Sequence, residues 1–324
     1  MRSKRLAVAV MMAAMMLVAC KDGSNGKHWL STVNESTGKP YEVLVASEDS
    51  IAARIIRQAL EKPVEGLPQE EPSFDVSSIS THRLDAMLRR TRNLVIVKKA
   101  ENPSAKTSIR MKENLYAQPQ TVVYISIPSN NRLQTDLLTK GAMLRKLLEK
   151  GEQQTAVEQL KNRHNEKAEA MIQKMFGVNM LIPADMTSWK EGRDFLWLSN
   201  NSPTRMQSIC LYLCHNATPM FNNKDSWVRV RDSVMRVNIP GEEPNMYMTT
   251  GRASLSEVQG REGTRYELRG LWEMKDDMMG GPFVSIALTK GGKQVVAEAF
   301  VYAPSEKKRN LLRQLEASLQ TLSP

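Results

Sequence analysis

The spacing of the apolar positions changes near the middle of the chain. Over residues 40–177, short β-branched runs alternate with segments in which apolar residues recur every three or four positions. From residue 178 onward, most segments show continuous apolar runs or apolar residues at every second position, which is typical of strands. The pattern predicts an α+β fold, with an α/β-like half at 40–177 packed on an antiparallel, strand-rich half at 178–324 that ends in a helix.

The first half opens with a predicted strand at 41–45, followed by a helix over 51–59 that Pro63 stops. Further strands are expected at 74–79, 94–97 and 121–127. A leucine-rich segment at 133–148 predicts a helix that is interrupted near Gly141 and closed by Gly151. A longer helix then runs from about Val157 to Met175, with Gly177 at its C-cap.

Seven strands are expected in the second half: 178–182, 194–199, 207–214, 246–249, 264–275, 282–289 and 294–302. Alternation is clearest in the fifth, where one face carries Tyr266, Leu268, Trp272 and Met274 and the other carries Arg265, Glu267, Arg269 and Glu273. The final helix is expected to begin after Pro304, with Ser305 as its cap. Lys307, Lys308 and Arg309 would then lie in its first turn, where the helix dipole disfavours cations. This placement suggests an acidic neighbour or an anionic surface, but ordinary solvation is the favoured interpretation.

The N-terminus has the form of a bacterial lipoprotein signal. Arg2, Lys4 and Arg5 precede an unbroken apolar stretch from Leu6 to Val18, and Cys20 follows Ala19. Thirteen apolar residues are too few to span a bilayer as a mature helix. We therefore expect residues 1–19 to be removed, Cys20 to carry the lipid, and 20–39 to form a flexible Gly/Ser/Asn/Thr-rich tether. The alternatives are a cleaved secretory signal with an incidental cysteine, or an N-terminal anchor helix.

Composition limits the remaining choices. The formal charge is +10, and it falls to +7 when residues 1–19 are removed with their three basic side chains. A hydrophobic fraction of 41% is enough for a sizeable core, in one large domain or two packed ones. Cys210 and Cys214 would lie too far apart along a strand to form a disulfide. Nucleic acid is excluded as a partner because an exported lipoprotein does not meet the chromosome.

Several segments resemble a family of Bacteroidetes lipoproteins known only as a domain of unknown function. The resemblance is carried mainly by Arg269-Gly270-Leu271-Trp272-Glu273, by 279–285 and by 300–304. Further similar segments are 66–72, 194–199, 231–233 and 238–241. The resemblance implies an envelope location and a fold. It implies no catalytic residue.

The sequence predicts neither a metal site nor a cofactor. Cys210, Cys214 and His215 are the ligand types that zinc and copper prefer. On a strand, however, the two thiols would lie too far apart to share one ion, and His215 would point to the other face. Buried apolar cysteines are the favoured interpretation. The four histidines are scattered, and no nucleophile elbow, phosphate loop or dinucleotide fingerprint is present.

The leading functional hypothesis is a lipid-anchored, non-catalytic binding or envelope-maintenance protein, with an envelope protein or glycan as its partner. A candidate contact surface comprises Arg269, Trp272 and the loop Asp276-Asp277-Met278-Met279, in which acids, large apolar side chains and glycines meet between strands. The alternative for that loop is a turn whose methionines pack inward. The alternative function is an envelope glycan hydrolase that would use Glu273 and Asp277 as its carboxylate pair.

Two further expectations concern modification and location. Ser50 and Ser233 each follow an aspartate and precede an apolar residue, which is similar to the O-glycosylation acceptor of this bacterial group. The segment Lys21-Asp22-Gly23-Ser24 supplies one acid beside one base, whereas surface export in this group resembles a rule that needs an acidic cluster. The prediction is the periplasmic face of the outer membrane, with cell-surface display as the alternative.

Overall fold

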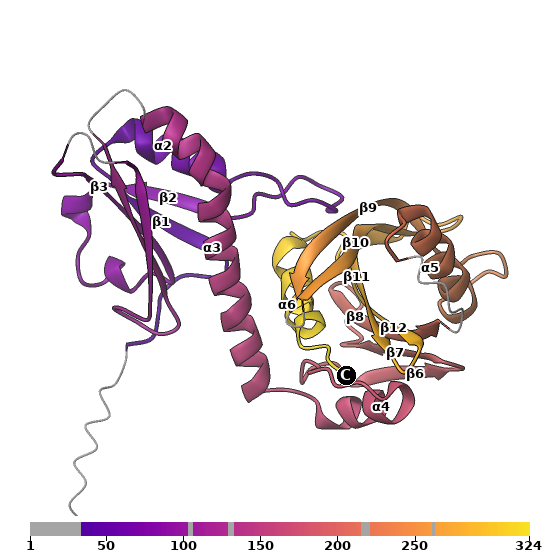
Figure 1. Cartoon of the computed structure of the whole chain (residues 1–324). Coiled ribbons are helices and arrows are strands. Elements are labelled where there is room, and N and C mark those ends of the chain that lie inside the picture. Colours follow the sequence, from indigo (N-terminus) through magenta and orange to yellow (C-terminus); the bar gives the residue numbers. More distant parts are fainter. Residues whose placement is uncertain (1–33, 103–105, 129–132, 215–220, 261–262) are drawn as a thin grey trace, which may run out of the picture. The chain divides into compact units, whose positions relative to one another are not determined.

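The computed structural model describes residues 34–324, apart from 103–105, 129–132, 215–220 and 261–262. It has an α+β fold with one five-stranded and one seven-stranded sheet (Figure 1). The predicted fold class is therefore confirmed. The predicted signal segment, including Cys20, lies outside the described residues. Among the residues that are described, no helix is both long and apolar enough to cross a membrane.

The first half is an α/β unit built on the five-stranded sheet, whose order is β2-β1-β3-β5-β4. Four of these strands are parallel, and the edge strand β4 pairs with β5 in the antiparallel sense. The elements are β1 (Glu42–Ala46), α2 (Ser50–Leu60), β2 (Asp75–Ile79), η1 (Thr81–Arg83), η2 (Leu88–Arg90), β3 (Asn93–Lys99), β4 (Ser108–Glu113), β5 (Thr121–Ile127) and α3 (Leu133–Asn162). The β-branched runs predicted as strands form the buried centre of this sheet, as parallel strands require.

Helix α3 is longer than the sequence predicts, because neither glycine ends it. A Cβ on Gly141 would collide with Ala59 of α2, and a Cβ on Gly151 would collide with the hydroxyl of Thr121 on β5. The two glycines therefore allow close approach to α2 and the sheet rather than a break. An ion pair fixes the same helix further along, where Arg92 donates two hydrogen bonds of 2.8 and 2.9 Å to the buried Glu152.

The residues just before the predicted boundary at 40 already contact the α/β half. Residues 34–37 are already held by the α/β half: Ser36 donates to the Gln118 carbonyl, and Thr37 donates to the Arg90 carbonyl. Arg90 in turn donates to the Glu35 carbonyl at 2.8 Å. The folded part thus begins several residues before the predicted boundary at 40.

The second half is built on the seven-stranded antiparallel sheet, in the order β6-β7-β8-β12-β11-β10-β9. Its elements are α4 (Glu166–Phe176), β6 (Ser188–Gly192), β7 (Phe195–Ser199), β8 (Met206–Cys214), α5 (Lys224–Asn238), β9 (Met248–Gly260), β10 (Gly263–Met274), β11 (Gly280–Lys290), β12 (Lys293–Tyr302) and α6 (Arg309–Gln320). The predicted 246–249 strand extends to residue 260, and β6 was not predicted. The predicted strand at 178–182 is wrong: this segment is extended but pairs only through isolated bridges, such as that between Asn179 and Ser323.

The long segment predicted as one helix over 157–175 is interrupted. Helix α3 ends at Asn162, and α4 starts at Glu166 after Asn165, whose side chain accepts a hydrogen bond from the Ala168 amide. Gly177 is the left-handed C-cap of α4, as predicted, with φ of 68°. The turn at 163–165 redirects the chain from the α/β half onto the seven-stranded sheet.

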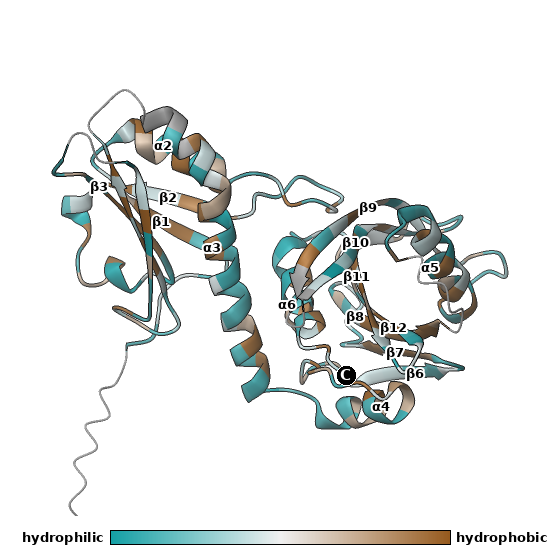
Figure 2. Ribbon diagram, viewed as in Figure 1, coloured by the Kyte–Doolittle hydropathy of each residue, from teal (hydrophilic) through white to brown (hydrophobic). Residues whose placement is uncertain are grey.

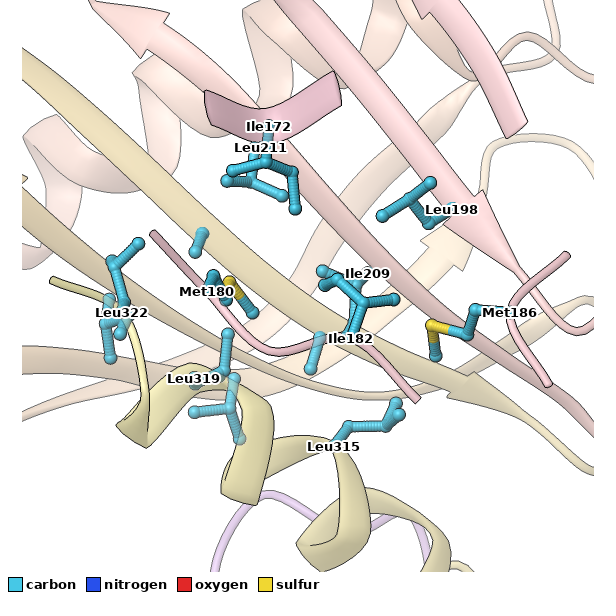
Figure 3. Close-up of a cluster of buried hydrophobic side chains, with 14 of the residues drawn as sticks. Ile172, Met180, Ile182, Met186, Leu198, Ile209, Leu211, Leu315, Leu319 and Leu322 are labelled. Carbon is cyan, nitrogen blue, oxygen red and sulfur yellow. The ribbon is translucent and has the colours of Figure 1, made fainter. Parts of the chain in front are cut away.

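The seven-stranded sheet is covered on both faces, and the two faces differ in chemistry. Under α4, α6 and the 178–186 segment lies a face we call the aliphatic face, made mainly of Leu, Ile, Val, Ala and Met side chains (Figure 3). Under α5 lies the aromatic face, whose buried members include Phe195, Tyr212, Trp227, Trp272, Phe283 and Phe300. Figure 2 shows hydrophobic residues concentrated along the strands and hydrophilic residues over much of α3. The strand alternation predicted for 264–275 places Leu268 and Trp272 on the aromatic face.

Candidate functional site

A cleft of about 700 Å³ lies between the second half of α3, the β9–β10 hairpin and α6. This volume is within the usual range for small-ligand sites. Its lining is mainly amide and charged groups, with a few aliphatic side chains at the margins: Lys150, Gln153, Gln154, Val157, Glu158, Val258, Arg265, Glu267, Arg269, Glu316, Leu319 and Gln320. The polar face that the sequence predicted for the 264–275 strand thus forms one wall of the cleft.

Arg269 is the centre of the charge arrangement in this wall. Its guanidinium lies 2.8 Å from a carboxylate oxygen of Glu316 on α6 and 3.1 Å from one of Glu267 on its own strand. Burial alone would lower the pKa of Arg269, but attraction to Glu316 and Glu267 outweighs it, so that its pKa is raised. Both carboxylates are therefore held by the same cation.

Helix α6 forms the third side of the cleft, and a distant carboxylate fixes its start. The buried side chain of Glu71 accepts hydrogen bonds from the amides of Lys308 and Arg309, at 2.6 and 3.1 Å. The predicted cap was Ser305, which is wrong: the helix begins at Arg309, and its N-cap residue Lys308 makes no side-chain cap. Glu71 supplies the missing acceptor and also opposes the positive end of the helix dipole.

Two cations at the start of α6 have an acidic neighbour, whereas the favoured interpretation of the sequence was ordinary solvation. Arg309 donates to Asp75 at 2.6 Å and to the carbonyl of Pro72. Lys307 lies 3.9 Å from the same aspartate. One turn on, Arg313 donates to Glu149 of α3 at 2.9 Å. The charged side of α6 is thus paired with the α/β half.

Tyr41 completes this contact. The Arg313 guanidinium lies over its ring, 4.6 Å from the centroid, and the ring itself is 4% exposed. Burial raises the pKa of Tyr41 to about 12, although the nearby Arg313 opposes the rise. Burial by itself lowers the pKa of Arg313, but Tyr41, Glu316 and Glu149 raise it overall. The phenol therefore stays neutral and the guanidinium stays charged.

The predicted contact residues separate into three places. Arg269 lies in the cleft, whereas Trp272 is buried in the aromatic face and donates to the Val301 carbonyl at 3.2 Å. The loop after β10 is exposed, and Met278 is fully exposed at 101%. Met279 is half-buried against the aromatic face. Met278 thus points into solvent, whereas Met279 packs against the aromatic face.

The carboxylates considered for glycan hydrolysis do not line the cleft. Glu273 and Asp277 are exposed, at the end of β10 and in the following loop. Asp277 accepts a hydrogen bond from the amide of Met278, which is a local turn contact. Asp276 has a φ of 62°, in the left-handed region that aspartate tolerates in turns. These acids therefore behave as turn residues.

The cysteines lie on β8, on the side of the aromatic face. Cys210 is fully buried and Cys214 is partly buried, and neither forms a disulfide. Burial, and then the nearby Glu298, raises the pKa of Cys210 well above its ordinary value. Burial raises the pKa of Cys214 to about 11. His215 lies outside the described residues, and within them no group of three or more His, Cys, Asp or Glu side chains is arranged to hold a metal ion.

Two histidines have local polar partners. The Nδ1 atom of His164 lies 2.9 Å from Glu169, which also accepts a hydrogen bond from the Ile182 amide. On the surface, Glu48 accepts hydrogen bonds from the hydroxyls of Ser80 and Thr81 and from the amide of His82. These bonds, with the Ser80 hydroxyl first, lower the pKa of Glu48 to about 2. Both arrangements hold loops and turns together.

The two serines considered for O-glycosylation are exposed but lie in helices. Ser50 is the first residue of α2, directly after the N-cap Asp49, and Ser233 is in the middle of α5. Asp232, which precedes Ser233, already accepts a hydrogen bond of 2.6 Å from the Thr250 hydroxyl. Modification at these serines stays a prediction.

The cleft includes residues that the sequence analysis did not single out, namely Lys150, Gln153 and Gln154 on α3 and Glu316 on α6. Among these residues, only Glu316 could have been noticed in the sequence, because it is an acid next to Leu315 in a helix with an apolar stripe. The α3 residues gave no signal, because a run of polar residues on a helix is normally a solvated face.

Comparison with known protein families finds two matches, one for each half. Residues 36–161 match a domain of unknown function, DUF8532, and residues 165–321 match another, DUF4837. A search of curated proteins gives no match. The two matched segments meet between Lys161 and Asn165, where α3 gives way to α4. The chain thus carries two domains of unknown function.

Proposed function

We propose that the protein is a lipid-anchored envelope protein that binds a polar ligand in the cleft and does not transform it. The observation that carries the proposal is the lining of that cleft, where amide and charged side chains from three elements face a volume of about 700 Å³. Amides can donate and accept hydrogen bonds, which suits the hydroxyl and amide groups of glycans and peptides.

The absence of catalysis is part of the proposal, and the arrangement of acids supports it. A carboxylate pair for glycan hydrolysis needs one protonated acid beside an ionised partner. In the cleft, Glu267 and Glu316 share Arg269, and Glu158 lies 2.6 Å from Lys161. All three cleft acids are therefore held by a cation.

The binding function can be tested by filling the cleft. Gln153, half-buried on α3, lines the cleft, and a Gln153→Trp substitution would place an indole in it. Met143→Trp is the matched control, because Met143 is 53% exposed on the same helix and does not line the cleft. The full-chain lipoprotein would be purified in mild detergent, and its co-purifying glycans and peptides measured by mass spectrometry. We expect a ligand with the wild type and Met143→Trp but not with Gln153→Trp. Equal recovery from all three would contradict the proposal.

The membrane anchor is proposed from the sequence around Cys20 and from the resemblance to lipoproteins. Growth with a clickable fatty acid should label the wild-type protein, and Cys20→Ser should abolish the label and leave the precursor unprocessed. Labelling that persists in Cys20→Ser would rule out this anchor.

The proposed location is the periplasmic face of the outer membrane, on the ground that Lys21-Asp22 offers only one acid to the export machinery. Protease treatment of intact cells should leave the protein whole, whereas lysed cells should show cleavage. Cleavage in intact cells would favour the cell surface instead.

A further inference from the structure

One arginine of the cleft forms no ion pair among the described residues. Arg265 is on β10, two residues before Glu267, and points to the same side of the strand as Glu267 and Arg269. Glu267 makes its ion pair with Arg269 rather than with Arg265. The Nε atom of Arg265 is buried and has no hydrogen-bond partner in the described part of the chain.

This arrangement is costly unless something else pairs with the guanidinium. A buried, unsatisfied charged donor loses its hydration without gaining an acceptor. Burial lowers the pKa of Arg265, and attraction to Glu267 offsets only part of that shift. The neighbouring Arg269, which is more deeply buried, has the opposite shift because two carboxylates hold it. The contrast marks Arg265 as the under-compensated cation of this wall.

A second cation lines the same cleft from α3. Lys150, on α3, is exposed, lines the cleft and makes no ion pair among the described residues. Glu158 is the α3 acid that lines the cleft, and it is paired with Lys161 rather than with Lys150. Two cations that form no ion pair among the described residues thus line one polar volume, together with Gln153, Gln154 and Gln320.

We propose that Arg265 and Lys150 bind an anionic group, a carboxylate or a phosphate, carried by the ligand of the cleft. The glutamines then contact the neutral polar groups of the same ligand. Arginine is suited to this role because its planar guanidinium offers two parallel N–H donors to the oxygens of either group. The inference rests on the proposed binding function and specifies the chemistry of its ligand.

The first experiment measures binding of three probes to the full-chain lipoprotein in detergent: inorganic phosphate, a galacturonic acid trimer and a neutral galactose trimer. Arg265→Gln is compared with Arg252→Gln, which removes the same charge from an exposed site on the neighbouring strand β9. We expect at least one acidic probe to bind the wild type and Arg252→Gln, and to bind Arg265→Gln at least tenfold more weakly. The trimer and phosphate arms distinguish a carboxylate from a phosphate. Equal loss in both variants, or no binding of either acidic probe, would overturn the inference.

A second measurement separates this inference from the proposed function. The co-purifying ligand is measured for Arg265→Gln, Lys150→Gln and Gln153→Trp, after circular dichroism has shown that each variant is folded. Loss with all three supports both proposals. If Gln153→Trp loses the ligand while Arg265→Gln retains it in full, the cleft binds a ligand but the anionic group is wrong. If Gln153→Trp also retains the ligand, the binding function itself fails.

Discussion

The two faces of the seven-stranded sheet are each covered by helices, but they bury different kinds of side chain. The aliphatic face buries Leu, Ile, Val, Ala and Met side chains under α4 and α6. The aromatic face buries Arg231 of α5 and Glu298 of β12, both with completely buried side chains. Apolar contacts have no preferred direction, whereas a hydrogen-bonded ion pair requires particular distances and angles between the two side chains. The comparison indicates that the contact of α6 with the sheet rests on buried apolar area, whereas the contact of α5 with the sheet also includes a buried ion pair.

The buried ion pair of the aromatic face is fully partnered. Arg231 donates to both carboxylate oxygens of Glu298 at 2.8 and 2.9 Å and to the Thr250 hydroxyl at 2.9 Å. Its guanidinium also lies 4.0 Å from the ring centroid of Phe283. Ser285 donates to Glu298 at 3.0 Å. This network joins α5 to three strands and leaves one arrangement in which all donors are satisfied.

The largest expected effect comes from breaking that pair. Glu298→Gln would leave the buried Arg231 with Asp232, 3.5 Å away, as its remaining carboxylate partner, so we expect a loss of about 3–5 kcal/mol in the free energy of unfolding. Urea denaturation would measure it. The double variant Arg231→Met/Glu298→Leu should lose less than either single change, because it removes both charges together. If the losses simply add, the pair does not hold α5 in position.

A somewhat smaller effect is expected on the aliphatic face. Leu315 of α6 is 1% exposed and lies among Ile182, Met186 and Ile209 (Figure 3). Leu315→Ala should cost about 2–4 kcal/mol through lost contacts and an unfilled cavity. Val237→Ala on α5, where the side chain is 76% exposed, is the control and should change the stability by less than about 0.5 kcal/mol. Leu315→Met should be nearly neutral, and a loss as large as that of the alanine variant would show that this face also demands a specific shape.

Removal of the Glu71 carboxylate that caps α6 tests whether buried apolar area alone positions this helix. Glu71→Ala leaves the amides of Lys308 and Arg309 without their acceptor, and we expect a loss of about 1–2 kcal/mol by urea denaturation. Glu70→Ala, at the exposed neighbouring position, is the matched control and should have little effect. A loss of unfolding free energy as large as that of Glu298→Gln would show that α6, like α5, depends on one specific polar contact.

The smallest effect concerns the reactivity of the thiols on β8. In a Cys20→Ser variant, Cys214 should react slowly with a disulfide reagent at pH 8, because burial raises its pKa to about 11. Cys210 should react more slowly still, since it is completely buried beneath the aromatic face. Mass spectrometry of the labelled peptides gives both rates, and urea should make them equal. Equal rates in the folded protein would mean that the aromatic face opens readily.

Local patterns in the sequence predicted most of the strands and one wall of the cleft. The alternation at 264–275 placed Arg265, Glu267 and Arg269 together because strand geometry alone dictates it. The sequence wrongly predicts helix breaks at Gly141 and Gly151. These glycines allow close contact with Ala59 and Thr121, which are distant in sequence, so no local pattern indicates their role. The strand predicted at 178–182 failed for a related reason, since its apolar residues pack against α4 and α6 without sheet pairing.

The other walls of the cleft could not be predicted in the same way. The α3 residues Lys150, Gln153 and Gln154 look like a solvated helix face until the second half of the chain is placed beside them. Glu71 lies in a Pro- and Gly-containing loop, where no local pattern indicates that it caps a helix starting at Arg309. Both features depend on contacts between residues more than 100 positions apart.

The distance in sequence between Glu71 and α6 has a consequence for protein synthesis and quality control. The helix that covers the aliphatic face, and that also contacts Asp75 and Glu149, is synthesised after residues 34–308. A chain cut short before residue 309 would present the uncovered Leu, Ile and Val side chains of that face to solvent, where proteases and holdase chaperones recognise them. A full-length polypeptide is therefore needed to cover the aliphatic face, and truncated copies would expose a surface that marks them for degradation.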